Sequence, residues 1–85
     1  MQKMNHLEAW DHFFTHVYQK EILGVRGAAT DVQRMKIRNA QRDRLGKRLI
    51  KGRPVALSAD RVQEILNEFA PGRYLVTPAV FEFVG

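Results

Sequence analysis

Apolar side chains recur at helical spacing in the first quarter of the chain. When residues 5–22 are placed at about 100° per residue, one arc of the circle is apolar and the opposite arc is polar. Asn5 is a residue type that caps helix amino ends, and Glu8 follows three positions later, as in a capping box. We therefore expect an amphipathic helix within residues 1–23. Its core-facing arc contains Leu7, Trp10, Phe13, Phe14 and Val17.

A second amphipathic pattern predicts a helix over residues 58–70. Ser58 is a favourable amino-terminal cap, and Leu57 and Val62 have the spacing of a hydrophobic staple. Pro71 and Gly72 follow, a pair that is typical of a helix end. The buried face of this helix is expected to contain Val62, Ile65, Leu66 and Phe69.

The carboxy-terminal residues 73–84 are rich in β-branched and aromatic side chains, which favours a β segment. Pro78 restricts this segment to a hairpin or an edge strand, because proline cannot donate a ladder hydrogen bond. Phe81 and Phe83 share one face, and we expect them to pack on the two amphipathic helices. The candidate partners of this segment are residues 53–57, its own other half, or a second copy of the chain.

Residues 30–51 also predict a helix, although their pattern is different. Thr30 or the residue after it is the expected cap. Gly46 costs about 1 kcal/mol relative to alanine in a helix interior, so two alternatives remain open. Either the helix stops at Leu45 and a hairpin turning at Lys51 and Gly52 follows, or the helix continues to about residue 50, which we favour.

The apolar residues of this 30–51 segment do not form a continuous face. Those that can line one side are Val32, Met35, Leu45 and Leu49. Arg38 and Arg42 fall within the same arc, and basic side chains fill much of the remaining circumference. A helix that is polar all round docks weakly unless another molecule covers it. We therefore expect this helix to lie largely at the surface.

These elements together predict an α+β fold, a small single domain over residues 1–85 with three helices and a short carboxy-terminal β segment. The chain contains no cysteine, which excludes disulfides and cysteine-based zinc sites. No run of about 18 apolar residues predicts a transmembrane helix, and the amino-terminal residues are too polar for a secretory signal. We therefore expect a cytoplasmic protein.

Positive charge is concentrated in residues 33–53. Nine of these residues are Lys or Arg and one, Asp43, is acidic, which gives the stretch a net charge of +8 when the whole chain carries +5. A solvated helix normally mixes acids with bases for support at i,i+4, and here Asp43 and Lys47 are the one such pair in the favourable orientation. Charge of one sign repels itself, and a polyanion would relieve that repulsion.

The charge pattern therefore favours a non-enzymatic regulatory protein that binds nucleic acid, either DNA or RNA, through phosphate contacts. Arg73 is expected at the margin of the basic surface, and two amides, Asn39 and Gln41, can read base edges. The predicted contact residues are Arg34, Lys36, Arg38, Asn39, Gln41, Arg42, Arg44, Lys47, Arg48, Lys51 and Arg53.

Other partners give alternative hypotheses. A phage- or plasmid-type inhibitor or adaptor can use the same basic face, or an exposed β edge, to bind a larger host protein or a second copy of itself. A membrane partner is disfavoured, because the basic helix has no continuous apolar face and no Trp or Phe. A winged helix-turn-helix is also disfavoured, because the helix over 58–70 carries Asp60, Glu64 and Glu68 where phosphates would lie.

The sequence does not predict an enzyme or a cofactor. Glu8, His12 and His16 are spaced four residues apart, and a pair of histidines at i,i+4 can bind zinc. The residues between the histidines are Phe, Phe and Thr, so no Glu stands in the general-base position, and we expect these histidines to be exposed on a polar face. The chain also has no catalytic triad pattern and no glycine-rich phosphate loop.

Overall fold

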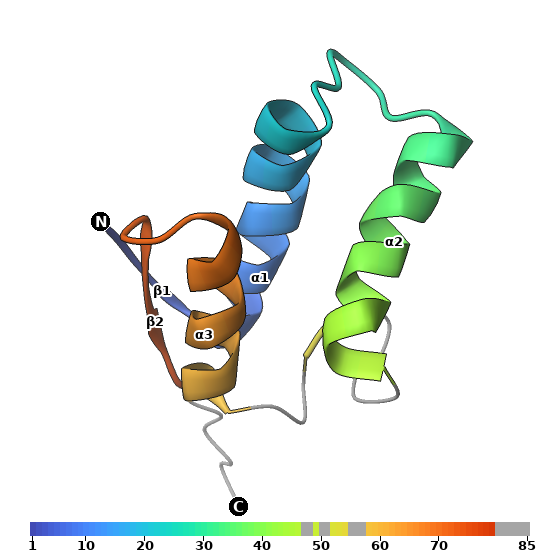
Figure 1. Cartoon of the computed structure of the whole chain (residues 1–85). Coiled ribbons are helices and arrows are strands. Elements are labelled where there is room, and N and C mark those ends of the chain that lie inside the picture. Colours follow the sequence, from blue (N-terminus) through green and yellow to red (C-terminus); the bar gives the residue numbers. More distant parts are fainter. Residues whose placement is uncertain (47–48, 50–51, 55–57, 80–85) are drawn as a thin grey trace, which may run out of the picture.

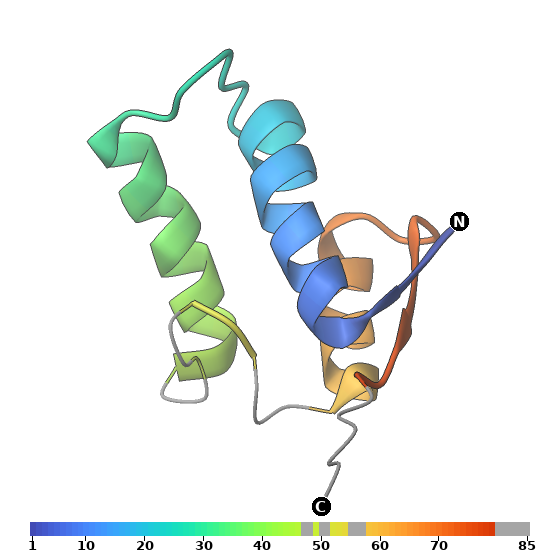
Figure 2. The same cartoon turned by 180° about the vertical axis from the view of Figure 1, so that it is seen from behind.

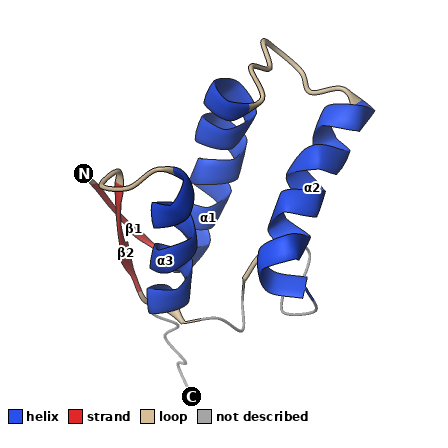
Figure 3. Cartoon of the chain, in the orientation of Figure 1, coloured by secondary structure: helices blue, strands red, loops and turns tan. Residues whose placement is uncertain are grey.

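The computed structural model describes residues 1–46, 49, 52–54 and 58–79 (Figures 1 and 3). Within these residues a strand leads into one long helix, two further helices follow, and a second strand ends the described chain. The elements are β1 (Gln2–Asn5), α1 (His6–His12), η1 (Phe13–Ile22), α2 (Asp31–Leu45), α3 (Ala59–Phe69) and β2 (Tyr74–Thr77). Helix η1 continues α1 without a break, so the α+β class with three helices is confirmed.

The two strands form a parallel pair made from opposite ends of the chain. Gln2 lies opposite Tyr74 and the register continues to Asn5 opposite Thr77. The strand β2 thus pairs with residues just before the first helix, a partner that the sequence did not suggest. Residues 55–57 and 80–84, which belong to two of the predicted partners, lie outside the described part of the chain. Phe81 and Phe83 lie outside the described residues.

Asn5 sets the boundary between β1 and α1. It has extended backbone angles, and its side-chain oxygen accepts hydrogen bonds from the backbone N–H groups of Leu7 (3.0 Å) and Glu8 (2.9 Å). The cap predicted from the sequence is confirmed, and it directs the preceding residues into the sheet. Beyond His12 the helix adopts π-type hydrogen bonding, so that the N–H of Leu23 donates to the carbonyl of Tyr18 at 2.9 Å.

Helix α2 ends earlier than we favoured. Thr30 caps it in a reciprocal capping box with Gln33. Gly46 has φ +55°, a conformation that glycine adopts without the Cβ penalty, and so the helix stops at Leu45. The extension to residue 50 was wrong, and the earlier stop was the correct alternative. The hairpin in that alternative rests mainly on residues outside the described part of the chain.

The side of α2 that faces the core also differs from the prediction. Leu45 is buried, but Val32 and Met35 are 64% and 59% exposed. Ile37, Ala40 and Leu49 pack against the core instead. The apolar residues of α2 do not share one arc, so the helix cannot bury all of them at once. It buries the side with Ile37 and Ala40, and Val32 and Met35 remain exposed.

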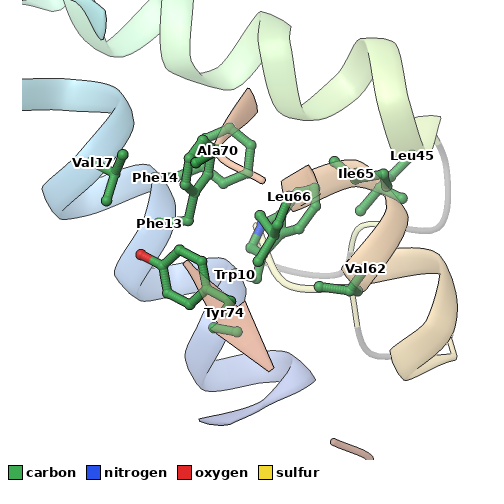
Figure 4. Close-up of a cluster of buried hydrophobic side chains, with 11 residues drawn as sticks. Trp10, Phe13, Phe14, Val17, Leu45, Val62, Ile65, Leu66, Ala70 and Tyr74 are labelled. Atoms are coloured by element: carbon green, nitrogen blue, oxygen red, sulfur yellow. The ribbon is translucent and has the colours of Figure 1, made fainter. Parts of the chain in front are cut away.

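The core is a layer of aromatic and aliphatic side chains between α1–η1 and α3, closed by β2 (Figure 4). The sheet lies against α3 and α1, and α2 stands on the other side of the α1–η1 helix (Figures 1 and 2). Ser58 caps α3 by accepting from the N–H of Arg61 at 3.3 Å. Leu7 is only partly buried, and Leu57 of the predicted staple is not described. The fully or almost fully buried side chains include Trp10, Phe13, Phe14, Val17, Val62, Ile65, Leu66 and Tyr74.

Two histidines join the first helix to the end of the chain. The buried His6 accepts a hydrogen bond at Nδ1 from the backbone N–H of Ala79 at 3.1 Å, and burial lowers its pKa. Nδ1 of His12 lies 2.7 Å from the hydroxyl of Tyr74. Burial lowers the pKa of His12 and raises the pKa of Tyr74, so burial favours the neutral form of both side chains in this hydrogen bond.

We expect the free energy of unfolding to fall as the pH is lowered through about 6.5, the ordinary pKa of histidine. Because the folded-state pKa values of His6 and His12 lie below this value, the unfolded chain binds more protons there and gains stability. Urea-unfolding midpoints measured between about pH 8 and about pH 5 test this. His6→Gln, which keeps a hydrogen-bond acceptor but does not titrate, should flatten the profile. A wild-type midpoint that does not change with pH contradicts the prediction.

Candidate nucleic-acid interface

One open cleft of about 850 Å³ is lined by residues of α2 and by Asp11 of α1, together with Gly46, Leu49, Gly52 and Arg53. The views in Figures 1 and 2 show α2 standing beside the α1–η1 helix, with the short yellow stretch at residues 52–54 passing beside the lower part of α2. The described lining residues are Asp11, Arg34, Ile37, Arg38, Gln41, Arg42, Gly46, Leu49, Gly52 and Arg53. Four of these ten are arginines, so the cleft is strongly basic.

The arginines come from two different segments. Arg34, Arg38 and Arg42 are four residues apart along α2, which places them in one row with a rise of about 6 Å between neighbours. Arg53 lines the same cleft, although it lies eight residues beyond the end of α2. Four guanidinium groups thus surround one open volume, although their Cα atoms span 20 residues of sequence.

Most of this positive charge is not neutralised by a described carboxylate. Arg34 has one long contact, 3.9 Å from its guanidinium to Asp31, and both side chains are largely exposed. Among the described residues, the ion pairs within 4.0 Å do not include Arg38, Arg42 or Arg53. Arginines that lack a carboxylate partner keep their donors available for an incoming anion.

The remaining lining residues define the polarity of the cleft. Ile37 and Leu49 contribute apolar surface, and Gln41 contributes an amide with both donors and an acceptor. Asp11 of α1 is the one carboxylate among the described lining residues. The cleft therefore has a cationic wall on α2 and a small anionic point on α1.

The structure divides the predicted contact residues into three groups. Arg34, Arg38, Gln41, Arg42 and Arg53 line the cleft. Lys36 and Asn39 do not line it: at about 100° per residue Lys36 falls opposite Arg38, and Asn39 falls beside Arg42 on the side away from Ile37. Lys47, Arg48 and Lys51 lie outside the described residues.

Arg44 is the last of the predicted contact residues, and it contacts α3 instead of lining the cleft. Its Nε donates to Glu68 at 2.9 Å, and its guanidinium lies 5.2 Å from the centre of the Phe69 ring. Arg73 is also engaged elsewhere, since it donates to Glu21 at 2.7 Å and lines a separate hollow with His12 and Tyr74. These two arginines help to hold the fold, and Arg73 does not lie at the margin of the basic cleft as expected.

Asp11 lines the cleft but was not predicted as part of the site. The sequence places it on the polar face of the first helix, but nothing local shows that α2 lies opposite. The apolar contribution of Ile37 was missed for the same reason. Both depend on the packing of α2 beside α1–η1, which is a long-range contact.

The histidine face of α1–η1 forms a second, smaller hollow. The rings of His12 and His16 are 4.8 Å apart between centroids, and Glu8 and Asp11 line the same hollow. Across the described ranges, no group of three or more His, Asp or Glu residues is placed to hold a metal ion. None of the helices in those ranges is long and apolar enough to cross a membrane.

The basic cleft is thus the feature of the described chain with the clearest binding chemistry. Its row of arginines, its volume and its exposed position are seen directly in the structure of this chain. Comparison with known proteins does not add to them, since no protein-family model, no curated protein and no solved structure matches the chain.

Proposed function

We propose that this protein is a non-enzymatic regulatory protein that binds nucleic acid, with the phosphates held by the arginines of the basic cleft. The observation that carries the proposal is the convergence of Arg34, Arg38 and Arg42 from α2 with Arg53 from the following segment around one open cleft. Each guanidinium offers a planar set of donors that matches phosphate oxygens. Four such groups around one volume favour a ligand that carries several phosphates.

Phosphate recognition of this kind depends strongly on salt. Each phosphate that a protein neutralises releases condensed counterions, so the logarithm of the affinity falls linearly with the logarithm of the salt concentration. The slope counts the phosphate contacts, which makes the contribution of particular arginines measurable.

The test is to replace Arg38 and Arg42 together by Gln and to measure binding of fluorescent oligonucleotides by anisotropy at several salt concentrations. We expect the affinity at low salt to fall about 10-fold or more, and the slope to become shallower by about 1.4 to 1.8 for two lost phosphate contacts. Lys20→Gln with Lys36→Gln is the matched control, because it removes two exposed charges outside the cleft. If the Arg38 and Arg42 variant keeps both the wild-type affinity and the wild-type slope, the cleft is not the site.

A protein partner is the second candidate function, and the exposure of Val32 and Met35 on the outer side of α2 favours it. Exposed apolar side chains next to basic ones are typical of interaction surfaces. An inhibitor or adaptor of this kind would use the basic helix more readily than β2, because the amide of Gln63 already bonds the carbonyl of Tyr74 and the N–H of Val76. Purification distinguishes the two functions, since a nucleic-acid binder co-purifies with material that absorbs at 260 nm.

A further inference from the structure

We infer that the nucleic-acid site continues from the cleft onto the exposed face of α2, where Met35 and Val32 make apolar contacts with sugars and bases. This inference rests on the proposed function. It follows from the arrangement of α2, in which exposed apolar side chains lie beside arginines of the cleft. A polymer held by those arginines would cover the apolar side chains as well.

Met35 shares a face of α2 with two arginines of the cleft. At about 100° per residue, Met35 lies about 20° from Arg42 and about 60° from Arg38 around the helix axis. Arg38 is also three residues beyond Met35, and side chains at this spacing are neighbours on a helix surface. Both arginines are exposed and both line the cleft. A phosphate held by Arg38 and Arg42 would therefore lie next to the Met35 side chain.

Val32 extends this apolar surface toward the amino end of α2. Val32 and Met35 are three residues apart, and their side chains are 64% and 59% exposed. Neither belongs to the hydrophobic core or packs against it, whereas Ile37 and Ala40 of the same helix do. The pair thus has no part in the described core, and its surface is available to a ligand.

The charges beside the pair indicate which ligand covers it. Alone, the pair would equally suit a protein, but two arginines of the proposed phosphate site lie on the same face. The carboxylates of α2, Asp31 and Asp43, lie near its two ends, and Asp31 is beside Arg34. The middle of this face is therefore both basic and apolar.

Nucleic acid matches both properties of this face. Its phosphates pair with guanidinium groups, while every base offers an apolar ring face and thymine also offers a methyl group. The methionine sulfur makes favourable contacts with aromatic rings, and its flexible side chain adapts to their positions. These apolar contacts are available in a single strand and at the base edges of a duplex groove.

Apolar and phosphate contacts respond differently to salt, which makes the inference testable. A phosphate contact releases counterions, so its loss makes the dependence of affinity on salt shallower. An apolar contact releases none, because it is driven by the removal of apolar surface from water. Its loss should lower the affinity by the same factor at every salt concentration.

The experiment measures binding of a labelled oligonucleotide, as a single strand and as its duplex, by anisotropy at several salt concentrations. For the form that binds more tightly, Met35→Ala should weaken binding about 3-fold or more and leave the salt slope unchanged. Arg38→Gln should instead make the slope shallower by about 0.7 to 0.9. Met35→Leu keeps the apolar surface and should keep most of the affinity.

Leu75→Ala is the matched control. Leu75 is 46% exposed and lies on β2, on the far side of the α1–η1 helix from α2 (Figures 1 and 2). Its truncation removes a similar apolar surface from outside the proposed site, so the affinity should not change.

The outcomes separate this inference from the proposed function. If Met35→Ala keeps the wild-type affinity, changes the salt slope as Arg38→Gln does, or weakens binding no more than Leu75→Ala, the inference is wrong while nucleic-acid binding stands. If neither form of the oligonucleotide binds at the lowest salt concentration, the proposed function fails and the inference fails with it. A loss of affinity at constant slope that Met35→Leu restores supports both.

Discussion

Replacing Phe13 by Ala should lower the free energy of unfolding by about 3–5 kcal/mol. Phe13 has no solvent exposure, so the change removes a whole ring from the core. Domains of this size are stabilised by only about 5–15 kcal/mol, and the variant should therefore be close to its unfolding threshold.

The position of the ring explains why the cost should be at the upper end of this range. Phe13 is the common neighbour of four other aromatic rings from η1, α3 and β2, as Figure 4 shows in part. Ring centroids lie at 4.9 Å for Phe14, 5.4 Å for Phe69, and 6.2 Å for both Tyr18 and Tyr74. Aromatic pairs contribute about 0.5–1.5 kcal/mol beyond the area that they bury, and the substitution removes all four.

Urea unfolding followed by circular dichroism measures this effect, with two variants for comparison. Met35→Ala also shortens an apolar side chain, but Met35 is 59% exposed, so its cost should stay within about 0.5 kcal/mol. Phe13→Leu keeps most of the apolar volume and should cost less than Phe13→Ala. A loss below about 1 kcal/mol for Phe13→Ala would mean that this ring does not organise the core.

The local features of this fold could be predicted from its sequence. The periodicity of the first and third helices correctly identified Trp10, Phe13, Val62 and Ile65 as core residues, and Asn5, Thr30 and Ser58 are the caps that their residue types suggested. Each of these features depends on residues within about one turn of each other, and so the pattern contains the necessary information.

The long-range features could not be predicted. Residues 2–5 have no alternation that indicates a strand, and they become β1 because β2, more than 70 positions away, lies beside them. The same holds for the candidate site. The periodicity already placed Arg38 and Arg42 in one arc of the helix, but the contributions of Arg53 and Asp11 depend on how the segments pack. Lys36 and Asn39 were predicted as contact residues from their charge and polarity alone. The prediction did not consider which side of the helix each residue lies on.

The contact between the Gln63 side chain and β2 is a long-range feature that no local pattern in the sequence indicates. We expect its loss to reduce the stability of the fold strongly. Its side chain lies on α3 and bonds the edge of β2 that faces away from β1, where a third strand would otherwise pair. The amide donates to the carbonyl of Tyr74 at 2.8 Å, and its oxygen accepts from the N–H of Val76 at 2.8 Å. One side chain thus satisfies a donor and an acceptor of the strand, as the N–H and C=O of one residue in a neighbouring parallel strand would.

Gln63→Met should therefore lower the free energy of unfolding by about 2 kcal/mol or more, because it keeps the length of the side chain but leaves two backbone groups of β2 without partners. The edge that it exposes can pair with another chain, so we also expect concentration-dependent self-association, measured by light scattering after size exclusion. Gln19→Met is the matched control, since Gln19 is half-buried on η1 and its side chain makes no hydrogen bond with a described residue. If Gln63→Met unfolds within about 0.5 kcal/mol of the wild type and self-associates no more than the wild type, the amide does not protect the strand, and water satisfies that edge equally well.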